Sequence, residues 1–372
     1  MRLVQTSAEG VVTKGFEQQV CLIAEECGGC GLINLPYKQQ LQVKQNRLKE
    51  LLEGNADALF QLKDIEASQN SLSYQSFAHL EISDYLAKGK RLIDIGYHHP
   101  ILKRVVDIKN CPVLLSSINH LVRSLRMLIN DFKIPTKKSR KDEPKLLKAT
   151  IKWFPSGGFL ILHVTTAQKG MFRELVSKLL ERHKLIGVIL SDEKQDVLMT
   201  GDDKIEETIL QKKFWLHYLS VKSTNPVQEE RLIQYIESMI RKKNPKSIYD
   251  YSEILTLRQK FFTQSFPNYK TLLSKRPEED LIALDVLEGS TLKTLPCSDV
   301  FLFERPRTFP SNVWNWLSTE KPQTLIFMTS FLQHLKNDLL LLSKCYKIQE
   351  IKPFDLKPGT EHIQLIVTLQ KK

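Results

Sequence analysis

The sequence predicts an α/β protein built on a doubly wound sheet, with an α+β region ahead of it. From Thr224 onward, short apolar segments alternate with helical patterns, an arrangement that produces parallel strands joined by crossover helices. Between about residues 72 and 222, strand patterns follow one another closely, which favours an α+β unit. Three cysteines, Cys21, Cys27 and Cys30, mark a further part near the N-terminus. We therefore expect three parts, at residues 1–71, 72–222 and 223–372.

The 372-residue chain has the composition of a globular protein with an excess of basic residues. Its 42% hydrophobic content excludes a disordered chain, and the sequence has no apolar run of the roughly 18 residues that span a membrane. The N-terminus has no signal-peptide pattern, which predicts a cytoplasmic protein with reduced thiols. The net charge of +12 favours a polyanionic partner, nucleic acid first, although lysines that only keep the surface soluble explain the same charge.

The cysteine segment reads Cys27-Gly-Gly-Cys30-Gly, with Cys21 just before it. Thiolates this close together, on a backbone that glycine allows to turn tightly, are typical of a metal centre. A fourth cysteine, Cys111, stands far along the chain.

A helix is expected over residues 36–53, because Pro36 suits the first helical position and Gly54 suits the position after the end. The leucines of this segment form its buried stripe, and Lys44 is expected on the outward face.

The middle part is expected to alternate strands with two helices. The strand patterns lie at residues 77–82, 91–95, 105–108, 149–154, 158–164, 185–190, 196–200 and 214–219, and the helical ones at 116–131 and 171–183. Residues 133–144 carry a basic run that is either a solvated connection or a contact for phosphate groups.

The last part is expected to begin with a helix at residues 227–242. Its strand patterns lie at residues 248–251, 281–286, 300–303, 324–328, 346–351 and 363–369. Cys297 and Cys345 stand in apolar stretches and are expected to be buried thiols without a special role.

The cysteine spacing, the segment Leu35-Pro-Tyr37 and the Cys-Pro pair at Cys111 resemble the iron-sulfur subgroup of the RNA uracil-C5 methyltransferases, which modify rRNA and tRNA. The resemblance continues in order to the C-terminus, without the family's N-terminal barrel. It implies a class I S-adenosylmethionine-dependent methyltransferase (Rossmann-like) domain at the C-terminus. It also implies a [4Fe-4S] cluster held by Cys21, Cys27, Cys30 and Cys111. Structural zinc is the rival, but zinc ribbons usually present two Cys-x-x-Cys pairs, whereas this chain has one.

Several positions depart from the family pattern where the resemblance places the cofactor. Ser223, before Asn225-Pro226, stands where the family has a glutamine. The first-strand motif around Asp250 lacks the glycine-rich turn that lets the backbone approach a cofactor. The acidic residue expected at the end of the second strand falls near Gln264, and Glu304 stands where the family has aspartate.

The reaction centre departs further, because Ser330 replaces the nucleophilic cysteine and Gln364 the basic glutamate. A serine hydroxyl ionises far less readily than a cysteine thiol, and an amide accepts no proton. Our leading hypothesis is a monomeric, catalytically impaired family member that carries a [4Fe-4S] cluster and acts in binding or assembling RNA, with rRNA first. The alternative is an active S-adenosylmethionine-dependent rRNA (uracil-5-)methyltransferase, so the sequence leaves open whether the chain is an enzyme.

Overall fold

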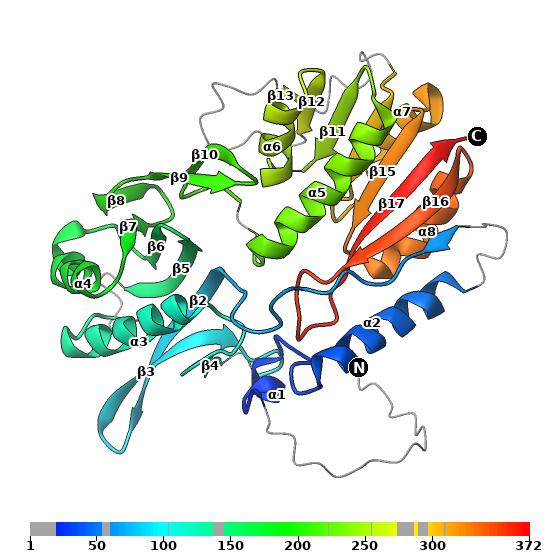
Figure 1. Cartoon of the computed structure of the whole chain (residues 1–372). Helices are drawn as coiled ribbons and strands as arrows, with labels where there is room; N and C mark the ends of the chain where they lie inside the picture. Colours follow the sequence, from blue (N-terminus) through cyan, green and yellow to red (C-terminus); the bar gives the residue numbers. More distant parts are fainter. Residues whose placement is uncertain are drawn as a thin grey trace, which may run out of the picture.

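The computed structural model describes residues 20–53, 60–102, 104–136, 145–221, 223–253, 255–273, 286–288, 297–308 and 310–372. Two large sheets lie within these ranges, one formed by the C-terminal part and one by the middle part (Figure 1). None of the described helices has the length and apolarity that crossing a bilayer requires.

The C-terminal sheet has eight strands in the order β1-β16-β17-β15-β14-β11-β12-β13. β17 runs antiparallel between β15 and β16, and the other paired strands are parallel. Its strands are β1 (Gln61–Leu62), β11 (Ile248–Ser252), β12 (Tyr269–Leu273), β13 (Val286–Glu288), β14 (Val300–Glu304), β15 (Thr324–Thr329), β16 (Tyr346–Phe354) and β17 (Gln364–Lys371).

Numbered from β11, the strands of this sheet follow the order 3-2-1-4-5-7-6, with the seventh strand reversed. This is the doubly wound class I methyltransferase arrangement that the resemblance implied. The central strands β11, β14 and β15 are buried on both faces, as the six consecutive buried residues of β15 show. The helices of this part are α5 (Pro226–Lys243), α6 (Leu257–Ser265), α7 (Ser311–Glu320) and α8 (Leu332–Ser343).

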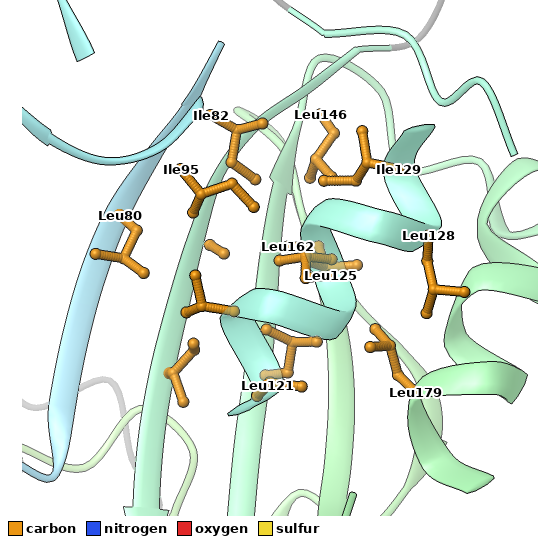
Figure 2. Close-up of a cluster of buried hydrophobic side chains, with 14 of the residues drawn as sticks. Leu80, Ile82, Ile95, Leu121, Leu125, Leu128, Ile129, Leu146, Leu162 and Leu179 are labelled. Carbon is orange, nitrogen blue, oxygen red and sulfur yellow. The ribbon is translucent and has the colours of Figure 1, made fainter. Parts of the chain in front are cut away.

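The middle part is a seven-stranded sheet in the order β4-β3-β2-β5-β6-β7-β8. Its strands are β2 (Phe77–Ala87), β3 (Lys90–His98), β4 (Val105–Asp107), β5 (Leu146–Phe154), β6 (Gly157–Val164), β7 (Leu185–Ser191) and β8 (Asp196–Gly201). Helices α3 (Ser116–Asp131) and α4 (Lys169–Arg182) share one core with it, and Figure 2 shows Leu121 and Leu125 of α3 packed against the strands. A separate hairpin of β9 (Lys204–Ile209) and β10 (Lys212–His217) follows.

The N-terminal segment packs on the C-terminal sheet. It comprises α1 (Ala24–Cys27), α2 (Tyr37–Leu52) and β1, which pairs in parallel with β16 at the sheet edge. Leu48 and Leu52 of α2 are buried in the same core as Leu335 and Leu339 of α8. Residues from the two ends of the chain therefore build one core.

The structure differs from the sequence-based expectation at several places. Lys44 is 1% exposed and faces the protein, so its outward placement was wrong, and Cys297 is exposed, so its burial was wrong. Helix α6 and strands β9 and β12 were not expected, whereas helix 116–131 is confirmed with its bounds. The basic segment 137–144 and residues 281–285 lie outside the described residues.

Candidate functional site

The four cysteines singled out by their spacing line one cavity of about 240 Å³. The cavity is otherwise walled largely by apolar and aromatic side chains: Ile23, Ile33, Tyr74, Tyr97, Ile108 and Val113. Its volume is several times the roughly 30 Å³ that a water molecule occupies in the liquid. A single zinc ion in a closed thiolate tetrahedron, with Zn–S bonds of about 2.3 Å, leaves no such space between its ligands.

Local hydrogen bonds hold the cysteine backbone in place. The Asn34 side chain accepts from the Cys21 amide at 2.9 Å and donates to the Cys21 carbonyl at 3.1 Å. Asn119 of α3 makes the same pair of bonds to Cys111, both at 2.9 Å. Gly28 ends α1 with φ of 67°, a left-handed conformation that glycine adopts without strain. These bonds fix the backbone of Cys21 and Cys111, two of the four cysteines that line the cavity.

Three of the four thiols, those of Cys27, Cys30 and Cys111, have a raised pKa and are therefore weaker acids than an ordinary cysteine. Burial first, and then the neighbouring Cys111, Cys27 and Cys21, raise the pKa of Cys30 to about 12. Burial also raises the pKa of Cys27 and of Cys111. A bound cation would replace these protons and relieve the repulsion among the four sulfurs. Within the described ranges, no three His, Cys, Asp or Glu side chains lie close enough to hold a single metal ion.

A buried ion pair stands beside this cavity. Lys44 Nζ donates to Asp355 Oδ1 at 2.7 Å and to the carbonyl of Lys357, a residue of the cavity wall, at 3.1 Å. Tyr37 donates to the other Asp355 oxygen at 3.0 Å, and Gln40 accepts from the Gly359 amide at 2.7 Å. Tyr37, Gln40 and Lys44 share one face of α2, because their spacing of three and four residues matches the helical turn.

The loop between β16 and β17 is also held by hydrogen bonds from the side of the cysteine cavity. The Leu32 amide donates to the Gly359 carbonyl at 2.8 Å, and Tyr74 donates to the Pro358 carbonyl at 2.9 Å. Gly359 has φ of 80°, and a Cβ there would lie 2.8 Å from Ile33 Cδ1. The loop leads directly into Gln364, the first residue of β17.

A second group of polar side chains lies at the carboxyl ends of β11 and β14. Arg258, in the first turn of α6, donates to both Asp250 oxygens at 3.0 Å and to Glu304 Oε2 at 3.0 Å. Tyr269 donates to Asp250 Oδ2 at 2.6 Å. The Asp250 side chain is 0% exposed and that of Arg258 6%. Burial alone lowers the pKa of Arg258, but the charges of Asp250 and Glu304 outweigh it and raise that pKa.

The structure brings Ser330 and Gln364 to adjacent strand ends. Thr329, the last residue of β15, is paired with Leu365 of β17, so Ser330 and Gln364 each lie next to the last pair of this antiparallel ladder. Ser330 is half-buried and is followed by Phe331, the residue before α8.

The other two predicted positions lie apart from this pair. Ser223 lines a small cavity of about 80 Å³ together with Pro226, Thr256 and Lys260. Gln264 lies within α6 and donates to the Lys213 carbonyl at 3.4 Å, so its placement at the end of the second strand was wrong. Because α6 intervenes, that strand is β12 and ends at Leu273.

Comparison with known proteins agrees with this architecture. No protein-family model matches the chain. An uncharacterized RNA methyltransferase of Clostridium tetani is 22% identical over 380 residues, covering 94% of this chain and 82% of the relative. An uncharacterized RNA methyltransferase of Enterococcus faecalis is 22% identical over 391 residues, which cover 95% of this chain and 84% of the relative.

Among solved structures, the tRNA (uracil-54, C5)-methyltransferase of Pyrococcus abyssi, in complex with S-adenosyl-L-homocysteine, has a TM-score of 0.71. The two sequences are 20% identical, and the alignment covers 92% of this chain and 85% of the Pyrococcus abyssi enzyme. The chain is similar to these RNA methyltransferases over nearly its whole length, and to the solved uracil methyltransferase in its fold. This likeness supports the class I methyltransferase fold of the C-terminal sheet.

The sequence patterns did not predict that Arg258, Lys44 and Asp355 belong to these buried polar groups. A signal for Arg258 existed, because a charged residue eight positions after Asp250 falls in the first turn of the next helix, where it can reach back to the strand. Lys44 and Asp355 gave none, since 311 residues separate them in the chain.

Proposed function

We propose that this relative of the RNA uracil methyltransferases holds a [4Fe-4S] cluster and binds RNA, with rRNA as the expected class of RNA. We propose further that it has lost most of its methyl-transfer activity. Its role is then in RNA binding or assembly. An RNA substrate accords with the relatives named RNA methyltransferases, and S-adenosylmethionine is the cofactor that the fold accommodates in other proteins.

The proposed loss of methyl-transfer activity rests on the two residues at adjacent strand ends, Ser330 and Gln364. Methylation at C5 of uracil requires a nucleophile that adds to C6 and a base that removes the C5 proton. A cysteine thiol, with a pKa near 8.5, serves as such a nucleophile, whereas a serine hydroxyl must first be deprotonated by a neighbouring base. Gln364 stands at the position of the family's basic glutamate, next to the last pair of the β15–β17 ladder, and an amide cannot take up that proton.

The cluster is supported by the donor set around the 240 Å³ cavity. Cys21, Cys27, Cys30 and Cys111 would hold it, and four thiolates are the usual ligands of a [4Fe-4S] centre. A cluster bound there would supply one-electron redox chemistry or, as we propose here, a covalent link between two segments of the chain. The cysteines themselves would join the turn before α2 to the segment before α3, which otherwise meet through the Ile33, Tyr74 and Val113 contact.

Two measurements on anaerobically purified protein test the binding part of the proposal. We expect stoichiometric iron and sulfide, and RNA binding whose affinity falls steeply as salt rises, because Lys and Arg contacts to phosphate release counterions. Zinc in place of iron would refute the cluster, and absence of RNA binding at low salt would refute the RNA role.

The impairment is tested separately with labelled S-adenosylmethionine and uridine-containing rRNA fragments. We expect no label in the RNA. Transfer of label to uracil C5 by the cluster-loaded protein would overturn the impairment and establish the alternative, an active methyltransferase.

A further inference from the structure

The strand order of the C-terminal sheet reverses between β11 and β14, which defines its topological switch point. In open α/β sheets, ligands bind in the crevice outside the carboxyl ends of the strands at such a point. Here β11 leads out at Ser252 and β14 at Glu304. The groups that fill this space therefore decide what the fold can bind.

Arg258 is the group that bridges it. Its guanidinium is held by three hydrogen bonds of 3.0 Å, two to Asp250 on β11 and one to Glu304 on β14. A bidentate pairing with one carboxylate and a third bond to another uses the planar fork of arginine fully. The bridge is formed wholly by the chain's own residues, on both sides of the switch point.

The turn that follows β11 keeps Arg258 in this position. Thr256 and Gln259 form a reciprocal capping box at the start of α6, and Gln259 Nε2 also donates to the Asp250 carbonyl at 3.2 Å. Ser252 donates to Gln259 Oε1 at 2.9 Å. These bonds tie the first turn of α6 to the strand end where a glycine-rich turn would let a cofactor approach.

The described cavity next to the first turn of α6 is small. The neighbouring cavity, which contains Ser223 and Thr256, has about 80 Å³, whereas pockets for cofactors and drug-sized ligands have about 300–1,000 Å³. Glu304 is 37% exposed, so the bridge meets solvent on the β14 side. A ligand bearing a positive charge can reach the bridge there and compete for the same carboxylates.

We propose that Arg258 acts as an internal gate, a guanidinium that occupies the switch point between Asp250 and Glu304 and must be displaced before S-adenosylmethionine can bind. The cofactor carries a sulfonium cation, so its charge and that of Arg258 are alternatives at the two carboxylates. This inference rests on the proposed function for the identity of the ligand, and it deepens that function by naming the residue that sets cofactor affinity.

The experiment is calorimetric titration of the full-length, cluster-loaded chain with S-adenosylhomocysteine and with S-adenosylmethionine. We expect Arg258→Gln to bind S-adenosylmethionine at least about tenfold more tightly than the wild type, a ratio that corresponds to about 1.4 kcal/mol, and to gain less affinity for S-adenosylhomocysteine, which lacks the sulfonium charge. Arg241→Gln is the matched control, because Arg241 pairs with Glu237 on the exposed face of α5, and its affinities should equal those of the wild type. Thermal unfolding monitored by near-UV circular dichroism checks that each variant is folded.

A second variant keeps the test decisive if Arg258→Gln does not fold. Arg258→Lys keeps a cation beside Asp250, but a single ammonium group lacks the planar fork that bridges both carboxylates, so this variant should also bind S-adenosylmethionine more tightly than the wild type. If neither folded variant binds more tightly than the wild type, the gate is refuted. The proposed function fails on other readouts, namely iron content, RNA binding and label transfer, so the two failures are distinguishable.

Discussion

Single residues of this protein carry consequences far along the chain, and Lys44 is the clearest case. Its ammonium is buried against Asp355, and these two side chains are 1% and 0% exposed. A buried ion pair contributes little net stability, but removing one partner leaves the other charge unpaired inside the protein.

We therefore expect Lys44→Met to lower the free energy of unfolding by about 3–5 kcal/mol. The double variant Lys44→Met with Asp355→Leu should lose clearly less, because it removes both charges. Urea denaturation of the three proteins measures the difference. Equal losses in the single and double variants would mean that packing, and not charge, explains the effect.

A second residue-scale prediction concerns two histidines on the middle sheet. His79 and His163 both hydrogen-bond the Thr150 hydroxyl, at 2.7 and 2.8 Å. Burial is the main cause that lowers the pKa of each below the ordinary 6.5. Protons then bind the unfolded chain more readily than the folded one, so this part of the stability is complete above pH 6.5 and is lost as the pH falls through the folded-state values.

We expect the free energy of unfolding to decrease between pH 7 and about 5, and to decrease less in a His79→Gln, His163→Gln variant. Urea denaturation at several pH values measures both slopes. Identical slopes in the variant and the wild type would assign the pH dependence to other groups.

At the scale of elements, helix α6 shows how local bonds prepare a site. Its capping box joins Thr256 and Gln259, and the same Gln259 holds the backbone of Asp250. We expect Thr256→Ala to destabilise the protein by about 1 kcal/mol, as the loss of such a cap usually does. Gln264→Ala is the control on the same helix, since Gln264 is exposed near its end. Thermal unfolding compares them, and a control that loses as much as Thr256→Ala would rule out the cap as the cause.

The elements that sequence patterns predicted were those with a simple apolar period. Helix α3 has a strong apolar stripe, with Leu121, Leu125 and Leu128 buried, and its bounds follow from the sequence. Helix α6 was not predicted, because it buries Arg258 and Gln259 alongside Phe261 and Phe262. Polar and apolar residues therefore share its inner face. A charged residue inside the protein breaks the pattern, and the partner that neutralises it is not visible in the sequence.

At the scale of the whole molecule, the cavity of the four cysteines is lined by segments that belong to the two different sheets' parts of the chain. Cys111 precedes α3 of the middle part, while Cys21, Cys27 and Cys30 precede α2, which packs on the C-terminal sheet. The spacing of Cys21, Cys27 and Cys30 predicted a metal centre, the family resemblance added Cys111, and the structure places all four around one cavity. The second wall, made by Lys357 and His362, was not predictable because nothing in the sequence marks these residues as neighbours of Cys30.

We expect Cys111→Ser to lower the iron content of the anaerobically purified protein and its thermal stability together, because one of the four proposed thiolate ligands is removed. Cys297→Ser should change neither, since Cys297 is exposed and lies outside the cavity. Iron analysis and thermal unfolding of both variants measure the effect, and equal iron content in Cys111→Ser and wild type would contradict the ligand set.

The grip of the cysteine turn on the loop before β17 has a consequence for biosynthesis. Leu32 and Gln40 bond to Gly359, so this wall of the cysteine cavity is translated more than 300 residues after the turn itself. At about 5–20 residues per second, the first three cysteines leave the ribosome roughly 15–70 s before that wall exists. During that interval, iron and sulfide for the proposed cluster can reach these thiols before the loop at Gly359 is made.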